Sequence, residues 1–250
     1  MCSVIKRIKT PTVFGRWGFC RFSTIFKNCS TLYYSKIMAS ETLILGVDLD
    51  GVCADYTAAF RPLVAEALNI PESSLPEERS WDFSEWGLSR DQFQDLHHKA
   101  VEESRMFRSM PVFENASEVL WRLSDAGVWI RIITHRLYVN WGHAIAVTDT
   151  VEWLDQARIP YRDICFLGEK PEVEADIYIE DAPHNITSLR SSGNSVIVFD
   201  APYNQELPGP RVTNWLNCEQ AILDLAAEKG FDIQPEIPGL SISDGRLLDE

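Results

Sequence analysis

Two aspartates stand two residues apart, followed by a glycine, in the segment Asp48-Leu-Asp50-Gly51 directly after the apolar run 43–47. A carboxylate can attack phosphorus to form an aspartyl-phosphate, while a second carboxyl group protonates the leaving oxygen and later activates water. The glycine permits a sharp turn and a close approach of backbone N–H groups to an anion. An EF-hand calcium loop does not fit, because it needs glycine at its sixth position and glutamate at its twelfth. The segment therefore predicts phosphoryl transfer, with an acidic turn of no function as the alternative.

Three later apolar runs also end in polar side chains: Thr134 follows 128–133, Lys170 follows 164–167, and Glu180-Asp181 follow 177–179. Each signal is weak alone, because a threonine often caps a strand end, and a lysine or an acid pair usually faces solvent. In an open parallel sheet, however, ligands bind outside the carboxyl ends of the strands. Four such ends in sequence order therefore indicate one site.

These side chains have complementary roles if they meet the aspartate pair. The Thr134 hydroxyl can donate a hydrogen bond to a phosphoryl oxygen, and Lys170 can neutralise charge on the nucleophile and the transferred group. Asp181 and Asp48 can hold Mg²⁺ through oxygen ligands, with water and phosphate completing the shell. The spacing of the five histidines does not indicate a zinc site.

The elements that must position these residues alternate short apolar runs with amphipathic helices, which is typical of a parallel sheet wrapped by helices. We expect an α/β fold, with strands at 43–47, 128–133, 164–167, 177–179 and 196–199. Helical periodicity predicts helices near 60–68, 89–104, 116–126, 144–157 and 218–229. Asn115 and Glu118 are predicted to form a capping box at the third of these helices, and Gly127 to end it.

About 80 residues separate the first two predicted strands, far more than one crossover needs, so an inserted subdomain is expected. It contains Trp81-Asp-Phe83-Ser-Glu-Trp86, which places three aromatic residues within six positions. The predicted organisation is a basic extension at 1–40, a catalytic core at 41–56 and 111–230, a helical cap at 57–110 and a tail at 231–250.

Charge is distributed unevenly along the chain. Seven of the 23 basic residues and none of the 37 acidic ones lie in residues 1–40, so the rest is strongly acidic. Such a surface disfavours a nucleic-acid polymer, and it suits a small anionic substrate only if a cation screens the site. No apolar run approaches a membrane span, so no membrane partner is expected. The six cysteines show no C-x-x-C spacing, which favours a reduced compartment.

The basic extension has two interpretations. Its lack of acids and its Lys, Arg, Ser and Thr content are typical of a mitochondrial transit peptide. Met38 lies just before the acidic body, so the extension could instead be an over-long reading frame or a disordered segment. The second interpretation is favoured and makes a cytoplasmic protein the expectation, with a mitochondrial one as the alternative.

Over residues 43–200 the four motifs resemble those of the haloacid dehalogenase (HAD) superfamily, and within it those of the 5′(3′)-deoxyribonucleotidases. The finer likeness rests on the run from Asp48 to Tyr56, the aromatic pair Trp81 and Phe83, Phe107 with Pro111, and Ile179-Glu-Asp181. It implies a three-layer Rossmann-like core with a small helical cap inserted after the first strand. It also implies a Mg²⁺-dependent hydrolase of nucleoside monophosphates.

The resemblance assigns roles to individual residues. Asp48 would be the nucleophile, Asp50 the acid and base, and Thr134 and Lys170 the phosphate ligands. The metal ligands would be Asp48, the main-chain carbonyl of Asp50, and Asp181. Tyr56, Trp81 and Phe83 would surround the nucleoside, although the aromatic residues could equally form the cap's own core.

Two departures concern the substrate. His135-Arg136 follow Thr134 where the deoxyribonucleotidases have Ser-Pro, and Glu180 replaces an aspartate. His135, taken as substrate-binding, and Arg136 could add positive charge near the phosphate or face solvent. A phosphatase for another small phosphorylated metabolite, or a non-catalytic HAD-fold binding protein, are the alternatives. A homodimer is left open.

Overall fold

The computed structural model describes residues 42–137, 142–167 and 170–235. The chain divides into two units, Met1–Ser40 and Glu41–Glu250, and all described residues belong to the second. The predicted extension at 1–40 and most of the predicted tail lie outside the described residues. Residues 231–235, the described part of that tail, form neither helix nor strand.

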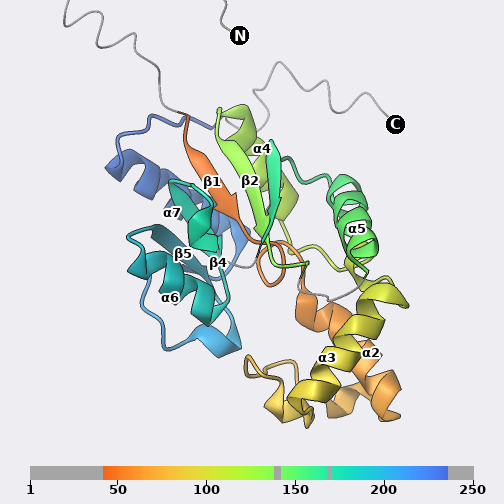
Figure 1. The fold of residues 1–250 in the computed structure, drawn as a ribbon. Coiled ribbons are helices and arrows are strands. Elements are labelled where there is room, and N and C mark those ends of the chain that lie inside the picture. The colour runs from red at the N-terminus through yellow and green to blue at the C-terminus, as the bar shows by residue number, and fades with distance from the viewer. Residues whose placement is uncertain (1–41, 138–141, 168–169, 236–250) are drawn as a thin grey trace, which may run out of the picture. The chain divides into compact units, whose positions relative to one another are not determined.

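The core of the second unit is a parallel sheet with strand order β3-β2-β1-β4-β5-β6 (Figure 1). Its strands are β1 (Ile44–Val47), β2 (Trp129–Thr134), β3 (Asp163–Phe166), β4 (Ile177–Glu180), β5 (Ser195–Phe199) and β6 (Arg211–Val212). The predicted α/β class and its five strands are confirmed. The sixth strand was not predicted, because two residues after a proline-rich loop carry no periodicity and take their register from β5.

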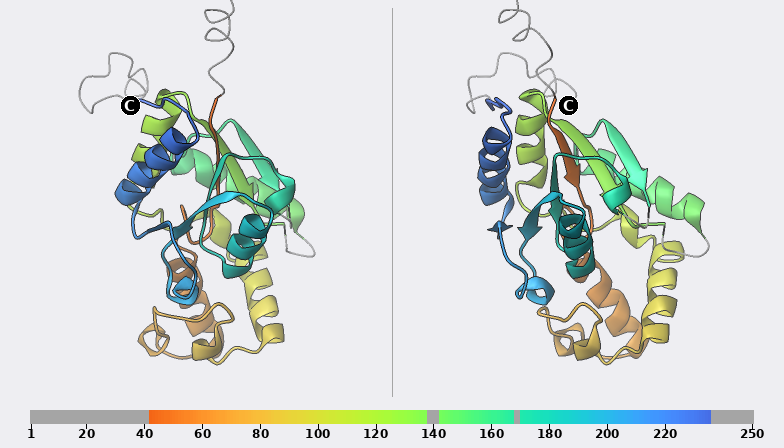
Figure 2. Two further views of the ribbon diagram at one scale, coloured as in Figure 1. Left: turned by 90° about the vertical axis from the view of Figure 1, so that its left-hand side faces the viewer. Right: turned by 60° about the vertical axis from the view of Figure 1, so that its left-hand side comes forward.

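Helices cover both faces of the sheet. Helices α4 (Ala116–Asp125) and α7 (Trp215–Glu228) lie together on one face, and α6 (Pro183–Ser191) lies on the other (Figure 2). Helix α5 (His143–Gln156) connects β2 to β3. Because successive side chains of a strand point to opposite faces, Ile177 and Ile179 join the larger core, whereas Tyr178 packs with the side chains of α6.

The inserted segment, residues 57–110, continues the chain after the turn that follows β1. It includes all but the first residue of α2 (Tyr56–Leu68), then η1 (Glu72–Ser74), η2 (Ser84–Trp86), α3 (Arg90–Glu102) and η3 (Met106–Arg108). Figure 1 shows it beyond the carboxyl ends of the strands. Phe60, Phe83, Trp86 and Phe93 pack ring against ring with centroids 4.9 to 6.2 Å apart. The segment therefore has an aromatic core of its own.

The predicted capping box at α4 is wrong. Asn115 occupies the N-cap position but has a φ of 62°, and its side chain makes no capping hydrogen bond. In this left-handed conformation the side chain is not aimed at the first turn, although asparagine tolerates it better than most residues. The predicted end is confirmed, because Gly127 has a φ of 92° and Val128 N–H donates to the carbonyl of Leu123.

Candidate active site

The sheet topology brings the predicted polar strand ends together. Strand β1 lies between β2 and β4, and the register pairs Val47 with both Ile132 and Ile179. The polar side chains at the strand ends are almost completely shielded from solvent: Asp48 is 8% exposed, Lys170 2%, Asp181 1% and Thr134 0%. Lys170 reaches this point from η4 (Lys170–Glu172), after β3. The predicted convergence at the carboxyl edge is therefore present.

Lys170 connects two of these strand ends. Its Nζ lies 2.7 Å from Oδ1 of Asp48 and 2.5 Å from Oε2 of Glu180. Burial alone would lower the pKa of Lys170, but the two carboxylates outweigh burial and raise that pKa above its ordinary value. The lysine is therefore a fixed positive charge beside Asp48.

Glu180 uses both of its oxygens within the protein. Oε2 accepts the hydrogen bond from Lys170, and Oε1 accepts from the backbone N–H groups of Asp181 at 3.2 Å and Ala182 at 3.0 Å. Burial acts to raise its pKa, but Lys170 outweighs burial and keeps the pKa of Glu180 below its usual value. Glu180 thus holds Lys170 in place and has little capacity left for another ligand.

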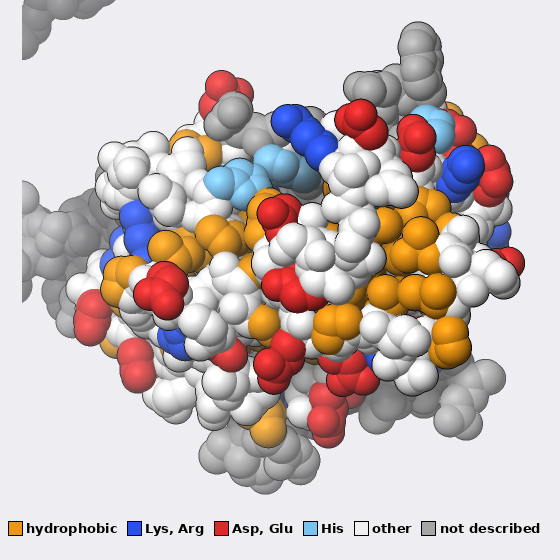
Figure 3. Space-filling view, turned by 90° about the horizontal axis from the view of Figure 1, so that it is seen from below, with side chains coloured by type: hydrophobic (Ala, Val, Ile, Leu, Met, Phe, Trp, Pro, Cys, Tyr) orange, Lys and Arg blue, Asp and Glu red, His pale blue; other side chains and the backbone are white. Residues whose placement is uncertain are grey.

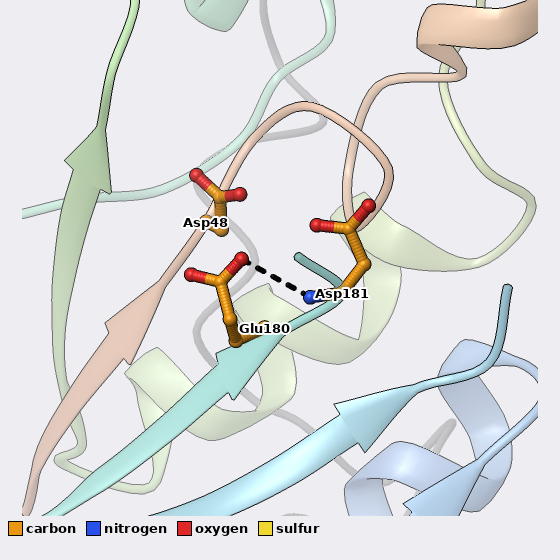
Figure 4. Close-up of side chains that lie close together, drawn as sticks. All are labelled: Asp48, Glu180 and Asp181. Carbon is orange, nitrogen blue, oxygen red and sulfur yellow. Dashed lines mark hydrogen bonds between the residues drawn. The ribbon is translucent and has the colours of Figure 1, made fainter. Parts of the chain in front are cut away.

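Asp48, Glu180 and Asp181 form an acidic cluster whose candidate ligand atoms all lie within 4.8 Å of one another (Figure 4). Oδ1 of Asp181 is buried without a hydrogen-bond partner among the described residues, whereas Oδ2 accepts a hydrogen bond from the Tyr203 hydroxyl. A buried carboxylate oxygen without a partner is costly unless a cation or water contacts it. The donor set of hard oxygen atoms fits Mg²⁺.

The charge of the acidic cluster also favours a bound cation. Burial and the Glu180 carboxylate raise the pKa of Asp48 to about 8, although Lys170 acts in the opposite direction. Burial, Glu180 and Asp48 raise the pKa of Asp181 well above its usual value. Three buried carboxylates therefore face one ammonium group, and a divalent cation would offset the remaining charge.

Gly51 makes the sharp turn that the sequence predicts, and it also lies close to the Asp181 side chain. Its φ is 88°, and a Cβ atom built there would lie 2.0 Å from Oδ2 of Asp181 and 3.0 Å from the Tyr203 hydroxyl oxygen. A side chain at this position would displace the Asp181 carboxylate. The turn after β1 therefore packs directly against the Asp181 carboxylate.

Asp50 is held by a residue that sequence reasoning left unassigned. Arg136 Nε lies 3.1 Å from both Asp50 oxygens, and Nη2 lies 2.7 Å from Oδ1. The arginine side chain is 0% exposed, with its guanidinium carbon 4.5 Å from the Phe107 ring centroid and 5.2 Å from that of Trp153. Of the two interpretations of this arginine, solvent exposure is wrong. Its aromatic partners come from distant parts of the chain, so no local signal identifies it.

The family comparison agrees with this geometry. The model of the family described as 5′ nucleotidase, deoxy (pyrimidine), cytosolic type C matches residues 42–229. This chain belongs to that nucleotidase family. It is therefore a hydrolase of phosphomonoesters, built on a parallel α/β sheet.

Two curated relatives and one solved structure are similar to the nucleotidase. A protein of Chlorobaculum tepidum named "Putative 5'(3')-deoxyribonucleotidase" is 45% identical over 188 residues, covering 74% of this chain and 93% of that protein. A 5'(3')-deoxyribonucleotidase of Bacillus subtilis (strain 168) is 25% identical, covering 72% and 98%. A predicted phosphatase from Clostridium acetobutylicum has a TM-score of 0.53 at 13% identity, covering 73% and 99%, and this likeness shows the fold alone.

The three aromatic residues predicted to surround the nucleoside lie in different environments. Phe83 is 5% exposed and stacks on Phe93 within the aromatic core of the inserted segment. Tyr56 is partly buried, and its hydroxyl lies 2.8 Å from Nδ1 of His97. Trp81 is 46% exposed, which makes it one of the most exposed large hydrophobic side chains among the described residues. Of these three residues, Trp81 is the one with a largely solvent-exposed side chain.

Trp81 stands beside two side chains of the nucleotidase core. Its ring centroid lies 5.3 Å from those of Tyr203 and His184, and the ring of His135 lies 6.2 Å from that of His184. A cavity of about 390 Å³ adjoins it, lined by Arg79, Trp81, Tyr203 and four further residues of the two segments. In the view from this side, histidine and hydrophobic side chains are exposed among acidic ones (Figure 3).

Within the described residues, no helix combines the length and the apolar character that crossing a membrane requires.

Proposed function

We propose that this nucleotidase is a Mg²⁺-dependent 5′(3′)-deoxyribonucleotidase that hydrolyses nucleoside monophosphates through an aspartyl-phosphate on Asp48. The observation that carries the proposal is the pairing of Asp48 with the Lys170 ammonium, 2.7 Å away, beside Asp181, whose buried Oδ1 has no hydrogen-bond partner among the described residues. This chemistry needs a nucleophilic carboxylate, a fixed cation and a metal-ligating carboxylate, together with a general acid and base, the role given to Asp50.

In the first half-reaction a carboxylate oxygen of Asp48 forms a bond to phosphorus while the bond from phosphorus to the ester oxygen breaks. Asp50 gives its proton to that oxygen, so the nucleoside leaves as an alcohol. Lys170 and the hydroxyl of Thr134 bind the equatorial oxygens of the transferred group. In the second half-reaction Asp50 takes a proton from water, and the water oxygen displaces Asp48 from phosphorus to release inorganic phosphate.

Asp48, Asp181 and the main-chain carbonyl of Asp50 would hold the Mg²⁺ ion, which supplies positive charge to the attacking carboxylate and to the phosphoryl oxygens. Glu180 is left out of this set, because both of its oxygens already accept hydrogen bonds. Its task is to keep Lys170 beside Asp48.

The inserted segment, residues 57–110, acts in this proposal as the substrate-recognising cap on a core formed by 41–56 and 111–230. Trp81 supports a nucleoside substrate, because an exposed indole beside a cavity can stack on a base for about 1–3 kcal/mol. Tyr56 borders a second cavity of about 410 Å³ together with Gly51 and Tyr203. His135 is placed on the core side, near the ring of His184.

A phosphatase for another small phosphorylated metabolite would use the same strand-end residues. The exposed Trp81 favours a nucleotide over a sugar phosphate, since a nucleobase has an aromatic face to stack and a simple sugar does not. The preference for deoxyribose rests on the description of the matching family and on the names of the two relatives.

The test is phosphate release from 5′- and 3′-(deoxy)ribonucleotides and sugar phosphates, with Mg²⁺ and with a chelator. We expect nucleotides to be preferred, the chelator to abolish turnover, and Asp48→Asn to lower kcat by at least ~10⁴-fold. Asp163→Asn is the matched control, because the Asp163 carboxylate forms an ion pair with Arg131 on the neighbouring strand β2 and is not part of the acidic cluster. Turnover that survives the chelator or Asp48→Asn contradicts the mechanism, and a preference for sugar phosphates contradicts the substrate.

A further inference from the structure

Tyr203 contacts the acidic cluster from a segment after β5 that sequence reasoning did not connect with the site. It lies in η5 (Pro202–Asn204), after β5, and its hydroxyl donates a hydrogen bond to Oδ2 of Asp181. A phenol beside a carboxylate can only donate, since the carboxylate is an acceptor. This bond occupies one oxygen of Asp181 and leaves Oδ1, which has no partner among the described residues.

The backbone around Tyr203 is fixed to the core. The neighbouring Asn204 is 1% exposed, and its Nδ2 donates to the carbonyl oxygens of Asp181 and Phe199, both at 2.8 Å. Its Oδ1 accepts from Arg211 Nη1 at 2.7 Å. Because Asn204 holds Asp181 through the main chain and Tyr203 holds it through the side chain, the direction of the Asp181 carboxylate is determined by η5.

The other side of Tyr203 contacts the inserted segment. The Trp81 ring meets it edge to face, with centroids 5.3 Å apart and planes at 68°. The Arg79 guanidinium carbon lies 4.7 Å above its ring and 3.9 Å above that of Phe83, and Nε donates to Thr57 Oγ1 at 3.1 Å. Arg79 is 5% exposed, so this contact is part of the packed interior. One tyrosine therefore contacts both a candidate metal ligand and the segment that bears Trp81.

We propose that Tyr203 is a positioning residue that links the inserted segment to the metal ligand Asp181. Its hydroxyl orients the Asp181 carboxylate so that Oδ1 is left for the cation. Because its ring packs against Trp81, a shift of Trp81 would also shift the hydroxyl and the carboxylate that it holds. The inference rests on the proposed Mg²⁺ dependence. It adds that metal affinity depends on the inserted segment, and by linkage that the metal stabilises one position of that segment.

The first test measures Mg²⁺ binding to the full chain by isothermal titration calorimetry, without substrate. Tyr203→Phe keeps the ring and its contacts with Trp81 and Arg79 and removes only the hydroxyl. We expect the Kd for Mg²⁺ to rise about tenfold or more, which is the usual effect of losing a group that orients a metal ligand. Tyr161→Phe, a half-buried tyrosine outside the acidic cluster, is the matched control and should leave the Kd unchanged.

The second test asks whether Trp81 acts through the hydroxyl. We expect Trp81→Ala to raise the Kd for Mg²⁺ about threefold in the native background. In the Tyr203→Phe background, the same substitution should leave the Kd unchanged. The difference between the two effects is the coupling that a double-mutant cycle measures. Because Trp81 is 46% exposed, its replacement should leave the fold intact. The effect of Trp81→Ala in the native background therefore tests the link even if Tyr203→Phe folds poorly.

The outcomes separate the two proposals. If the native protein binds no Mg²⁺, the proposed metal dependence fails and the inference fails with it. If the native protein binds Mg²⁺ and Tyr203→Phe binds it equally well, the metal dependence stands and the role of Tyr203 is overturned. If Trp81→Ala has no effect in the native background, or the same effect in both backgrounds, the link to the inserted segment is overturned.

Discussion

The strand-end site and the inserted segment were both predicted from residue types at particular positions of the sequence. They differ in how the structure places those side chains. Asp48, Lys170 and Asp181 are all at most 8% exposed and contact one another or shared partners. In the inserted segment, Trp81 is 46% exposed and Phe83 is 5% exposed, although only one residue separates them. A parallel sheet brings strand ends to one edge whatever their side chains, whereas in an irregular segment packing decides which side chain faces a ligand.

The largest effect that tests this contrast is expected for Arg136→Met, on the core side. The variant frees the Asp50 carboxylate from its three contacts with the guanidinium, and misplacing a catalytic group by about 1 Å can cost roughly 100-fold. We expect kcat/KM to fall about 100-fold for a nucleoside monophosphate, whose alkoxide needs a proton. For 4-nitrophenyl phosphate, whose phenolate leaves without one, we expect a fall of less than about fivefold.

Arg122→Met is the control for that experiment. Arg122 makes a similar two-bond pair with Glu219, at 2.8 and 2.7 Å, between α4 and α7. It should alter neither substrate's kcat/KM by more than about twofold. Equal losses for both substrates in Arg136→Met would show that the arginine supports the fold of the site and not the direction of Asp50.

Trp81→Leu and Phe83→Leu form the next test, because they apply one change to the two environments of the inserted segment. We expect Trp81→Leu to raise KM for nucleotides about tenfold, the loss of one stacking contact, with the free energy of unfolding unchanged. Phe83→Leu should instead lower the free energy of unfolding by about 1 kcal/mol, since it alters a packed ring cluster, with KM nearly unchanged. Steady-state kinetics and urea unfolding measure both. The reverse pattern would place the nucleoside against Phe83.

The core was predictable because hydrophobic runs fix strands and strand ends fix the site. The Asp48 and Asp181 positions follow from counting along β1 and β4, with no knowledge of what surrounds them. The turn at Gly51 was predictable from its residue type, because a left-handed φ favours glycine, whereas its contact with Asp181 was not predicted.

The residues that were missed act through partners far away in the chain. Arg136 is buried only because Phe107 and Trp153 cover it, and Tyr203 matters only because β5 ends beside β4. Phe83 is the opposite case, since its residue type suits a nucleoside but its ring stacks on Phe93. Sequence periodicity describes which face of an element is apolar, and it contains no information on which distant side chain will cover a polar group.

The smallest expected effect concerns His97, which lies in α3 with its ring stacked on Phe93 and its Nδ1 bonded to the Tyr56 hydroxyl. Burial lowers the pKa of His97 to about 4. His97 in the unfolded chain binds a proton near pH 6.5, whereas in the folded protein it stays neutral down to about pH 4. The contribution of the neutral His97 to the free energy of unfolding is therefore fully present above pH 6.5 and is lost as the pH falls toward 4. At pH 5.5 the loss in the free energy of unfolding should be less than about 1.4 kcal/mol.

His97→Asn keeps a hydrogen-bonding atom near Nδ1 without this titration. Urea unfolding of the variant should therefore show a smaller loss in the free energy of unfolding between pH 7.5 and 5.5 than in the native protein. Equal losses would mean that the interior of the inserted segment admits water, in which case Phe83 would be as accessible to a substrate as Trp81.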